Sequence, residues 1–355
     1  MKLKSTFVKL TQWEHWPSYM FYVPLVPFYT LEWFKTRSLT FFLNTNPAIK
    51  YSGDGTESKY KTIMMVPEKF RPKSILINKL ADFNTVINKI NEAKIIFPLI
   101  AKPDLGFRGF LVKKINSENE LKIYLKKNNS IKILIQEYLQ YKNECGILYY
   151  RFPNDKKGKI TSITLKKFLT VKGDGVSTLR NLVLNDNRAY LYLDLLENIH
   201  QEKLETIPVK DKKVVLTVIG NHSKGTEFLN GNHLIDNVLV ETFDQLNKQI
   251  EGWYFGRLDI KYNDFEDLKK GKNFKILEIN GIIAEPTHIY DTSNKEASYA
   301  KALKALKENW RTIFKIAKQN NKNQNLEIPT FNDYLKNIFF LRTYSRKLKK
   351  LNKNN

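Results

Sequence analysis

Two short segments of alternating polarity, residues 254–260 and 274–281, constrain this chain more than any other feature. Each alternates apolar and polar side chains over the length of a β-strand, and the polar, glycine-containing stretch between them predicts a hairpin. Residues two apart on a strand point to the same face, so Glu278 and Asn280 would lie side by side, with Asp259 on the neighbouring strand. Three such oxygen donors are the ligands that Mg²⁺ prefers.

Arg257 lies two residues before Asp259 and therefore on the same face of the predicted strand. A guanidinium there could hold a phosphoryl group bound to the metal. The competing interpretation is an acidic surface hairpin whose charges face water, and the hairpin alone favours neither.

The composition points to a globular protein that attracts polyanions. The chain has 355 residues, 42% of them hydrophobic, which is enough for a substantial core and for two or three lobes. Its formal net charge is +23, and no acidic residue follows Asp333. Nucleotides and anionic membranes fit this field, whereas the absence of any nucleic-acid-binding motif argues against specific nucleic-acid binding. The single cysteine, Cys145, excludes an intramolecular disulfide and fits a reducing compartment.

The stretch 17–34 is almost wholly apolar and is followed by Lys35 and Arg37. It falls slightly short of the roughly 20 residues that span a bilayer, and it contains Pro24 and Pro27. Its region is rich in the residue types that favour the membrane–water boundary: Trp13, Trp16, Tyr19, Tyr22, Tyr29 and Trp33. We expect a membrane-associated or re-entrant element, with an aromatic arm packed on the protein's own surface as the alternative.

Residues 97–112 predict a strand that ends in Lys102, a glycine-bounded loop and a second strand. Gly106 and Gly109 would let backbone amides approach a phosphate chain, while Lys102 and Arg108 supply positive charge. Taken alone, this signal is weak because many hairpins contain two glycines.

Residues 131–139 predict a further apolar strand, which ends in polar groups. The strand end at Gln136, Glu137 and Leu139 could present backbone groups and one carboxylate to an adenine edge. Shortly afterwards, Glu144 could accept hydrogen bonds from ribose hydroxyls.

This order of strand, glycine loop, strand, helix, strand, hinge and distant Asp…Glu-x-Asn hairpin resembles the ATP-grasp superfamily over residues 79–291. The site motifs are similar to those of D-alanine:D-alanine ligases and of cyanophycin-synthetase-like and glutamate-ligase-like enzymes. The chain most closely resembles a bacterial branch with an apolar, aromatic N-terminus. The resemblance implies that Lys102 binds the α- and β-phosphates, that Lys79 is a further phosphate-facing lysine, and that Gly106 to Gly109 form a mobile loop over the triphosphate. It also implies that Gln136 to Leu139 form the adenine hinge and that Glu144 binds ribose. Two Mg²⁺ ions would be held by Asp259, Glu278 and Asn280, and the transferred phosphoryl group would be bound by Arg257.

Two intervening segments have both functional and structural interpretations. Residues 173–175 form a Gly-Asp-Gly turn before a helix that we expect Ser177 to cap; similar segments occur in cyanophycin-synthetase-like ligases, and an ordinary turn is the alternative. Further on, the resemblance makes Asn221, His222 and Lys224 candidates for substrate or phosphate contact, with a surface loop as the alternative.

The sequence departs from the peptide ligases after Asn280. Where those enzymes have a proline-glycine turn that shapes an amino-acid pocket, this chain continues with residues 281–291, which puts a D-alanine substrate in doubt. Glu285 and His288 could contact the acceptor or transfer a proton, although a histidine beside aromatic residues is more often structural.

The expected fold class is α+β, an ATP-grasp fold of two lobes enclosing the nucleotide, with a small α/β pre-domain and an N-terminal aromatic helical arm. The expected divisions are a membrane-facing arm (1–51), a connector and pre-ATP-grasp lobe (52–97), a lid lobe (98–145), a core lobe with the metal site (146–320), and a basic C-terminal helix with a partly frayed tail (321–355).

The expected function is an ATP- and Mg²⁺-dependent carboxylate-amine ligase that forms ADP and an amide through an acyl phosphate. Its substrates would be small-molecule or lipid-linked carboxylates and amines, met on the cytoplasmic side of an anionic membrane. Two alternatives remain open: an ATP-grasp kinase that phosphorylates a hydroxyl, and a non-catalytic nucleotide-binding protein at the membrane surface.

Overall fold

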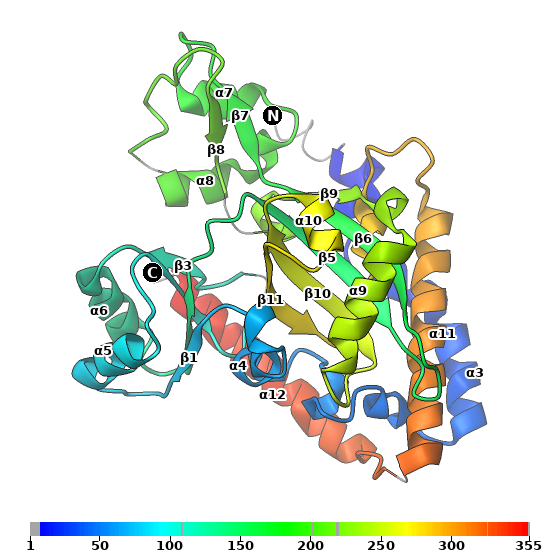
Figure 1. Ribbon diagram of the computed structural model, residues 1–355. Helices are drawn as coiled ribbons and strands as arrows, with labels where there is room; N and C mark the ends of the chain where they lie inside the picture. The colour runs from blue at the N-terminus through cyan, green and yellow to red at the C-terminus, as the bar shows by residue number, and fades with distance from the viewer. Residues whose placement is uncertain (1–7, 108, 201, 218–219, 325, 354–355) are drawn as a thin grey trace.

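The computed structural model describes residues 8–107, 109–200, 202–217, 220–324 and 326–353, and Figure 1 labels its elements. The α-helices are α2 (Tyr19–Tyr22), α3 (Val26–Thr36), α4 (Lys59–Met64), α5 (Phe83–Glu92), α6 (Glu118–Lys127), α7 (Leu179–Asn185), α8 (Leu193–His200), α9 (Asn237–Lys248), α10 (Phe265–Lys269), α11 (Tyr299–Gln324) and α12 (Phe331–Lys353). The strands are β1 (Ser74–Ile77), β2 (Leu99–Pro103), β3 (Lys113–Ile115), β4 (Ile133–Glu137), β5 (Asn143–Tyr150), β6 (Lys159–Lys167), β7 (Thr170–Lys172), β8 (Lys213–Val215), β9 (Glu227–Asn230), β10 (Phe255–Tyr262) and β11 (Phe274–Asn280).

The first sheet is four-stranded and antiparallel, in the order β1-β4-β2-β3. Helices α5 and α6 bury their apolar stripes against it, and each begins at a residue whose side chain accepts a backbone N–H: Asp82 from Thr85 and Ser117 from Glu120. We expected β1 and α5 in a separate small lobe before residue 98. That boundary is wrong, because β1 pairs directly with β4 and α5 shares the core of β2 and β3.

The second sheet is five-stranded and antiparallel, in the order β11-β10-β5-β6-β9. Helix α9 covers one face, where Leu239, Phe243 and Leu246 pack on the sheet (Figure 1). The predicted hairpin is confirmed as β10 and β11, although its connection contains the short helix α10. The α+β class expected from the sequence is therefore confirmed.

A small unit between β6 and β9 contains β7, β8, α7 and α8 and projects from the second sheet (Figure 1). Its core is made mainly by buried leucine and valine side chains of these elements and of the segments that connect them. We expected Ser177 to cap the helix here, but the structure assigns that role to Thr178, whose hydroxyl accepts the N–H of Asn181. The Gly-Asp-Gly turn closes on itself instead, because Asp174 accepts the N–H groups of Val176 and Ser177.

The N-terminal segment packs against α11 and the loop before it. Phe21 and Leu25 are almost fully buried there. The aromatic residues that we expected at a membrane boundary divide into two groups: Trp13, Trp16, Tyr22 and Tyr29 pack against the protein, whereas Tyr19 and Trp33 are exposed. Within the described ranges, no helix combines the length and apolarity needed to cross a bilayer.

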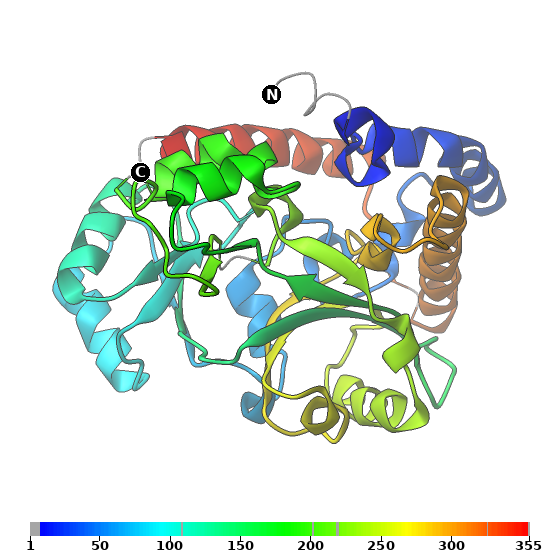
Figure 2. The same cartoon turned by 90° about the horizontal axis from the view of Figure 1, so that it is seen from above.

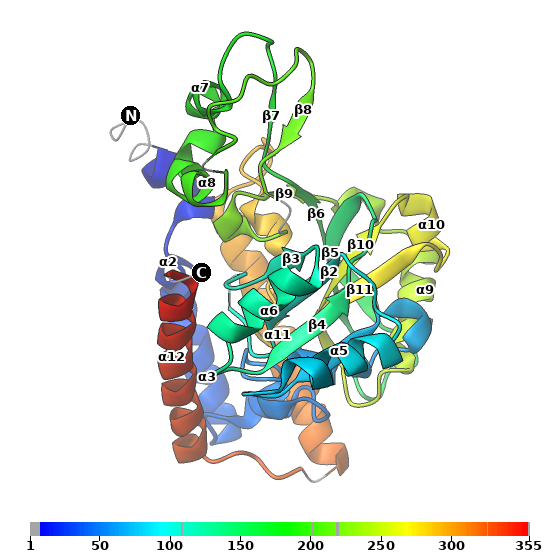
Figure 3. The same ribbon diagram turned by 90° about the vertical axis from the view of Figure 1, so that its left-hand side faces the viewer.

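Helix α12 crosses the molecule along the same side as α2 and α3 (Figures 2 and 3). Near its start, Asn337 donates to Asp54, while near its end Leu348 is fully buried in the core of the four-stranded sheet. Asn352 accepts the N–H of Leu111 just beyond the glycine loop. The expected frayed tail is wrong for residues up to 352, because this part of α12 has a packed and hydrogen-bonded face.

Asn46 connects the N-terminal segment to the start of β10. Its side chain is fully buried; its Oδ1 accepts the N–H groups of Tyr254 and Phe255, and its Nδ2 donates to the carbonyls of Ser52 and Phe255. Nearby, Gly281 follows β11 directly, and a Cβ there would clash with the carbonyl oxygen of Ser52. The chain around residue 52 is therefore held against the end of β11.

Replacing Asn46 with alanine should lower the free energy of unfolding by about 2–4 kcal/mol, because it leaves two buried N–H groups without acceptors. Urea denaturation of both proteins measures the difference. Asn129→Ala is the matched control, since the Asn129 side chain is exposed and only its backbone carbonyl is used. Equal loss in the two variants would contradict the structural role of Asn46.

Candidate functional site

The predicted metal ligands meet on the face of the five-stranded sheet opposite α9. Asp259 and Glu278 are direct neighbours across β10 and β11, and Arg257 is the neighbour of Asn280. The Asn280 amide donates to Asp259 at 3.1 Å, and Arg257 binds the same carboxylate through Nε at 2.9 Å and a terminal nitrogen at 3.2 Å. The strand register alone therefore brings the three oxygen donors and the arginine together.

Asp259 is ionised although it is buried. Burial acts to raise its pKa, but Arg257 and Lys166 hold the pKa well below the usual range. Lys166, on β6, lies 3.2 Å from Asp259 and 2.7 Å from Glu144, and its side chain is only 5% exposed. Glu144, predicted to bind ribose, is thus part of the same charge network, and its carboxylate lies against Gly220.

Lys59 is a site residue that the sequence analysis missed. It begins α4, and its ammonium group forms an ion pair with Glu278. The hydroxyl of Ser58 caps this helix, while Asp104, at the end of β2, accepts the N–H of Tyr60 and the hydroxyl of Ser58. These hydrogen bonds connect the start of α4 to the end of β2. Lys59 is therefore held next to the first residues of the glycine loop.

Lys102 lies on β2, as predicted, one residue before the end of the strand. Burial lowers its pKa from 10.5 to about 8, and the positive charge of Lys59 acts in the same direction, while Glu278 opposes the shift. A Cβ at Gly106 would lie 2.9 Å from the Lys59 side chain, and Gly109 has a φ of +71°. The left-handed φ explains a glycine at position 109, whereas at position 106 the near neighbour is the flexible end of the Lys59 side chain. Arg108 lies outside the described residues.

In the expected adenine hinge, two of the predicted side chains make hydrogen bonds within the protein. Gln136 is buried and its amide donates to the Ser74 hydroxyl, while Glu137 accepts the N–H of Lys73. Leu139 is also buried. The side chains of Gln136 and Glu137 thus fasten β4 to the start of β1.

Lys79 is not brought to the charge network. It lies in the exposed turn after β1, on the far side of β4 from the β2 strand that carries Lys102. The resemblance implied that Lys79 faces phosphate; in the structure it is Lys59 that pairs with Glu278.

The acceptor-side candidates lie along the contact between the N-terminal segment and the loop after β11. Tyr22 and Tyr290 both donate to Glu285, which is close enough to Arg257 to affect its pKa. His288 shares a 2.7 Å hydrogen bond with Ser162, and burial lowers its pKa. His288 is therefore a neutral side chain hydrogen-bonded to Ser162 of β6.

The loop that carries the remaining candidates closes on itself and on its neighbours. Asn221 accepts the N–H of Ser223, and His222 pairs with Glu14 at 2.7 Å. Lys224 lies over the ring of Phe110, which follows Gly109, and burial lowers its pKa. The loop at residues 221–224 thus contacts the end of the glycine loop. Its three candidate side chains do not point to one common site, because each has a different partner.

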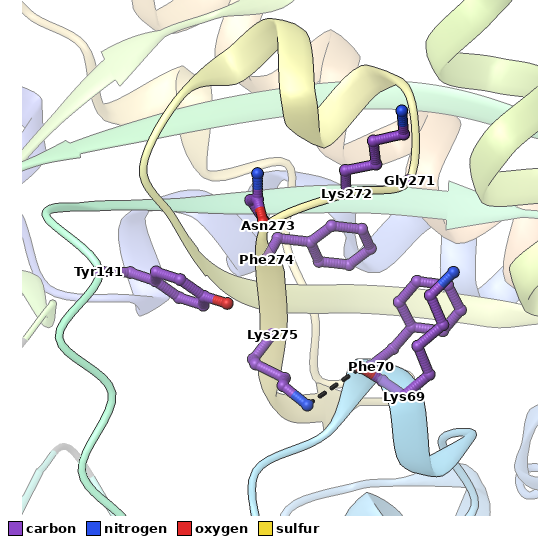
Figure 4. Close-up of a pocket in the computed structure, with 8 residues that line it drawn as sticks. All are labelled: Lys69, Phe70, Tyr141, Gly271, Lys272, Asn273, Phe274 and Lys275. Atoms are coloured by element: carbon purple, nitrogen blue, oxygen red, sulfur yellow. Dashed lines mark hydrogen bonds between the residues drawn. The ribbon is translucent and has the colours of Figure 1, made fainter.

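A shallow hollow of about 280 Å³ opens at the start of β11, the end of the strand that is farther from Asn280 (Figure 4). Its lining is basic and aromatic: Lys69, Phe70, Tyr141, Gly271, Lys272, Asn273, Phe274 and Lys275. Lys275 donates to the Lys69 carbonyl across it. None of the predicted site residues lines this hollow, and the concentration of buried charge lies at the other end of the strand pair.

The donor set at that end fits Mg²⁺ chemically. Two carboxylates and one amide oxygen converge from β10 and β11, and all three are hard oxygen donors. Lys59 and Lys166 now neutralise the two acids. Lysine and arginine side chains such as these can also bind nucleotide phosphates next to a bound metal ion.

Comparisons with known proteins gave matches to solved structures, and those described below have low sequence identity to this chain. No protein-family model matches the sequence, and no curated protein matches it. The chain is similar to a bifunctional glutathione synthetase from Pasteurella multocida, with a TM-score of 0.38 and 14% identity over 70% of this chain and 35% of that one. It is also similar to VanG D-Ala:D-Ser ligase from Enterococcus faecalis, with a TM-score of 0.42 and 13% identity over 76% of this chain and 64% of that one.

A third similar structure is D-alanine–D-alanine ligase from Bacillus anthracis, with a TM-score of 0.41 and 15% identity over 75% of this chain and 68% of that one. The chain thus spans about a third of the glutathione synthetase and just under two thirds of VanG. The chain's own two antiparallel sheets place Lys102 on one sheet and the Asp259–Glu278 pair on the other.

Nucleotide binding should be accompanied by proton uptake above pH 8. Lys102 has a pKa of about 8 in the free protein, so it is increasingly neutral there, and triphosphate charge would restore its proton. Calorimetry of a non-hydrolysable ATP analogue at pH 8.5, in buffers of different ionisation enthalpy, should show uptake of a substantial fraction of a proton. Lys102→Met should abolish the uptake, and uptake that persists in this variant would contradict the assignment.

Proposed function

We propose that this chain is an ATP-dependent, ADP-forming carboxylate-amine ligase that uses Mg²⁺. The observation that supports the proposal most is the buried charge network on β10 and β11, where Asp259 and Glu278 face Lys59 and Lys102. Burying this many charges is costly and stabilises nothing by itself, so a site that binds a charged ligand is the simplest reason for it.

In the proposed reaction, a carboxylate oxygen of one substrate attacks the γ-phosphorus of ATP, and ADP leaves. The resulting acyl phosphate is then attacked at carbon by an amine, so that the C–N bond forms, phosphate leaves and the amine releases a proton. Asp259, Glu278 and Asn280 would hold Mg²⁺, which when bound neutralises phosphate charge. Lys102, Lys59 and Arg257 would hold the phosphates and stabilise the charge that builds up during transfer.

The acceptor would lie near Glu285, beside the arginine. Tyr22 and Tyr290 fix both oxygens of this carboxylate, so its orientation does not depend on a ligand. A carboxylate held in this way can bind an ammonium group or accept the proton that the attacking amine releases. This arrangement favours an amine acceptor over the hydroxyl acceptor of a kinase.

Turnover of ATP by the protein, supplied with extracted metabolites and Mg²⁺, should yield ADP, phosphate and an amide detectable by mass spectrometry. Glu278→Gln should reduce this turnover by at least about a hundredfold, since it removes one charged metal ligand while keeping the side-chain volume. Glu266→Gln is the matched control on the exposed helix α10 of the same strand connection. Unchanged turnover in the Glu278 variant would refute the metal assignment.

The products separate the alternatives. A phosphorylated metabolite with ADP but no free phosphate would indicate the kinase. Binding of ATP without any product, together with equal behaviour of the two variants, would indicate a nucleotide-binding protein that does not turn over.

We further propose that α3 and α12 form a membrane-docking face. At their junction, Trp33 and Leu39 share a surface hollow with Ile328 and Phe331, so the exposed apolar side chains of the two segments are continuous there. Further exposed apolar residues lie on both helices: Val26, Leu31, Phe34, Ile338, Phe339 and Phe340. Exposed cations accompany them on α12, where each adds about 1 kcal/mol at an anionic surface: Lys336, Arg342, Arg346, Lys347, Lys349 and Lys350. A substrate carried by a lipid would then be within reach of a protein on the cytoplasmic side.

The full-length protein should float with anionic liposomes, and the triple variant Phe34→Ser, Phe339→Ser, Phe340→Ser should lose most of that binding at high salt, where charge attraction is screened. Ile96→Ser, Leu80→Ser and Val176→Ser, at exposed apolar positions elsewhere, provide the control. Removing residues before 52 is unsuitable, because it deletes the buried Asn46. Equal flotation of the two triple variants would exclude this face.

A further inference from the structure

A second cluster of ligand-type side chains lies away from the nucleotide site, where the N-terminal segment meets the loop after β8. Glu14 and His15 belong to the short 3-10 helix Trp13–His15, and His222 begins another at residues 222–224. His222 Nε2 lies 2.7 Å from one oxygen of Glu14, and His15 Nε2 lies 3.7 Å from the other. One ligand atom from each residue can be chosen so that all three lie within 4.8 Å of one another.

The Nε2 atom of His15 has no hydrogen-bond partner among the residues that the structure describes, although it is fully buried. The side chain is 9% exposed and faces Glu14 and the His222 ring, whose centroid lies 5.7 Å from its own. Burial lowers the pKa of His15 to about 4, so the ring is neutral at physiological pH. A buried polar atom without a partner calls for an explanation, and a bound ion or water is one that supplies the missing contact.

We propose that Glu14, His15 and His222 bind a divalent transition metal ion, with Zn²⁺ as the best fit. Two imidazoles and one carboxylate are a common zinc ligand set, and water can complete a tetrahedral shell. Zinc lies about 2.0–2.2 Å from such ligands, so the three atoms would have to approach one another to roughly 3.3 Å, a contraction available to side chains on two short helical turns.

Other contacts of Glu14 match those expected around a metal ligand. Arg188 donates to both carboxylate oxygens at 3.1 Å, and the Thr292 hydroxyl donates to one of them at 3.0 Å. Such outer contacts fix the orientation of a ligating carboxylate and leave it lone pairs for an ion. Burial opposes the charge of Glu14, but His222 and Arg188 hold its pKa at about 2, so the ligand is ionised.

The same contacts define the competing explanation. Arg188 and a protonated His222 could balance Glu14 without any metal and simply pin the N-terminal segment to the loop. This explanation leaves His15 Nε2 unsatisfied, which is why we favour the metal.

A bound ion would have a structural consequence beyond the proposed ligase chemistry. It would cross-link the N-terminal segment, which also reaches Ile289 through the Trp13 indole, to the loop whose Lys224 lies over Phe110. The ion would therefore hold the N-terminal segment and the loop after β11, which lie beside the proposed acceptor position, in a fixed place relative to the glycine loop.

The test is metal binding by the full chain after removal of metal with a chelator. Titration with Zn²⁺ in excess Mg²⁺, which occupies the proposed nucleotide site, should show one equivalent bound. His15→Gln and His222→Gln should each weaken binding by about a hundredfold or more, whereas His233→Gln, at an exposed position, should not change it. Equal Zn²⁺ affinity in the parent and both ligand variants would overturn the site.

A second measurement does not depend on the folding of any variant. Co²⁺ bound by the unmodified protein should give the visible absorption of a tetrahedral nitrogen–oxygen site, and one equivalent of Zn²⁺ should remove it. No saturable Co²⁺ or Zn²⁺ binding by the unmodified protein would mean that the cluster is an ion-paired pin only. Because neither readout involves ATP, failure here leaves the ligase proposal intact.

Discussion

The pairing of Asp259 with Glu278 across β10 and β11 is the contact on which the rest of the molecule depends. Two carboxylates at neighbouring positions on one face repel each other and are costly to bury, so the surrounding elements supply cations. Those cations come from four places in the chain: Lys59, Lys102, Lys166 and Arg257. A slip of one residue in the strand register would turn these charges into the core beneath α9, which makes the alternation of β10 both a folding signal and the basis of the site.

Much of this arrangement could be predicted from the sequence because it depends on short local patterns of apolar and polar residues. Period-two alternation identified β10 and β11, and the apolar run that ends at Lys102 identified β2. Lys59 and Lys166 escaped prediction for a physical reason: each reaches the site from an element whose own sequence contains no glycine loop or paired acid. A signal for Lys59 existed in the N-cap serine directly before it, but a capped helix start is common and does not by itself indicate a ligand.

The aromatic N-terminal segment shows the limit of composition in another way. Tryptophan and tyrosine favour both protein cores and membrane boundaries, since each has an apolar body and a polar edge. Only tertiary contacts distinguish Phe21, which is buried beside α11, from Phe34, which is exposed. The predicted hinge shows the same limit: the sequence does not reveal that the Gln136 side-chain amide donates to the Ser74 hydroxyl.

Helix α12 also affects the order in which the chain can fold. Leu348 completes a core that otherwise consists of residues between Ile77 and Ile135, so the ends of that core are separated by most of the sequence. During synthesis, the four-stranded sheet would leave the ribosome long before this helix, with the apolar surface that Leu348 covers still exposed. Closing such a long loop slows folding more than it reduces stability. Part of the hydrophobic surface of this core therefore stays uncovered until α12 has been made, and exposed apolar surface of this kind makes a nascent protein prone to aggregation.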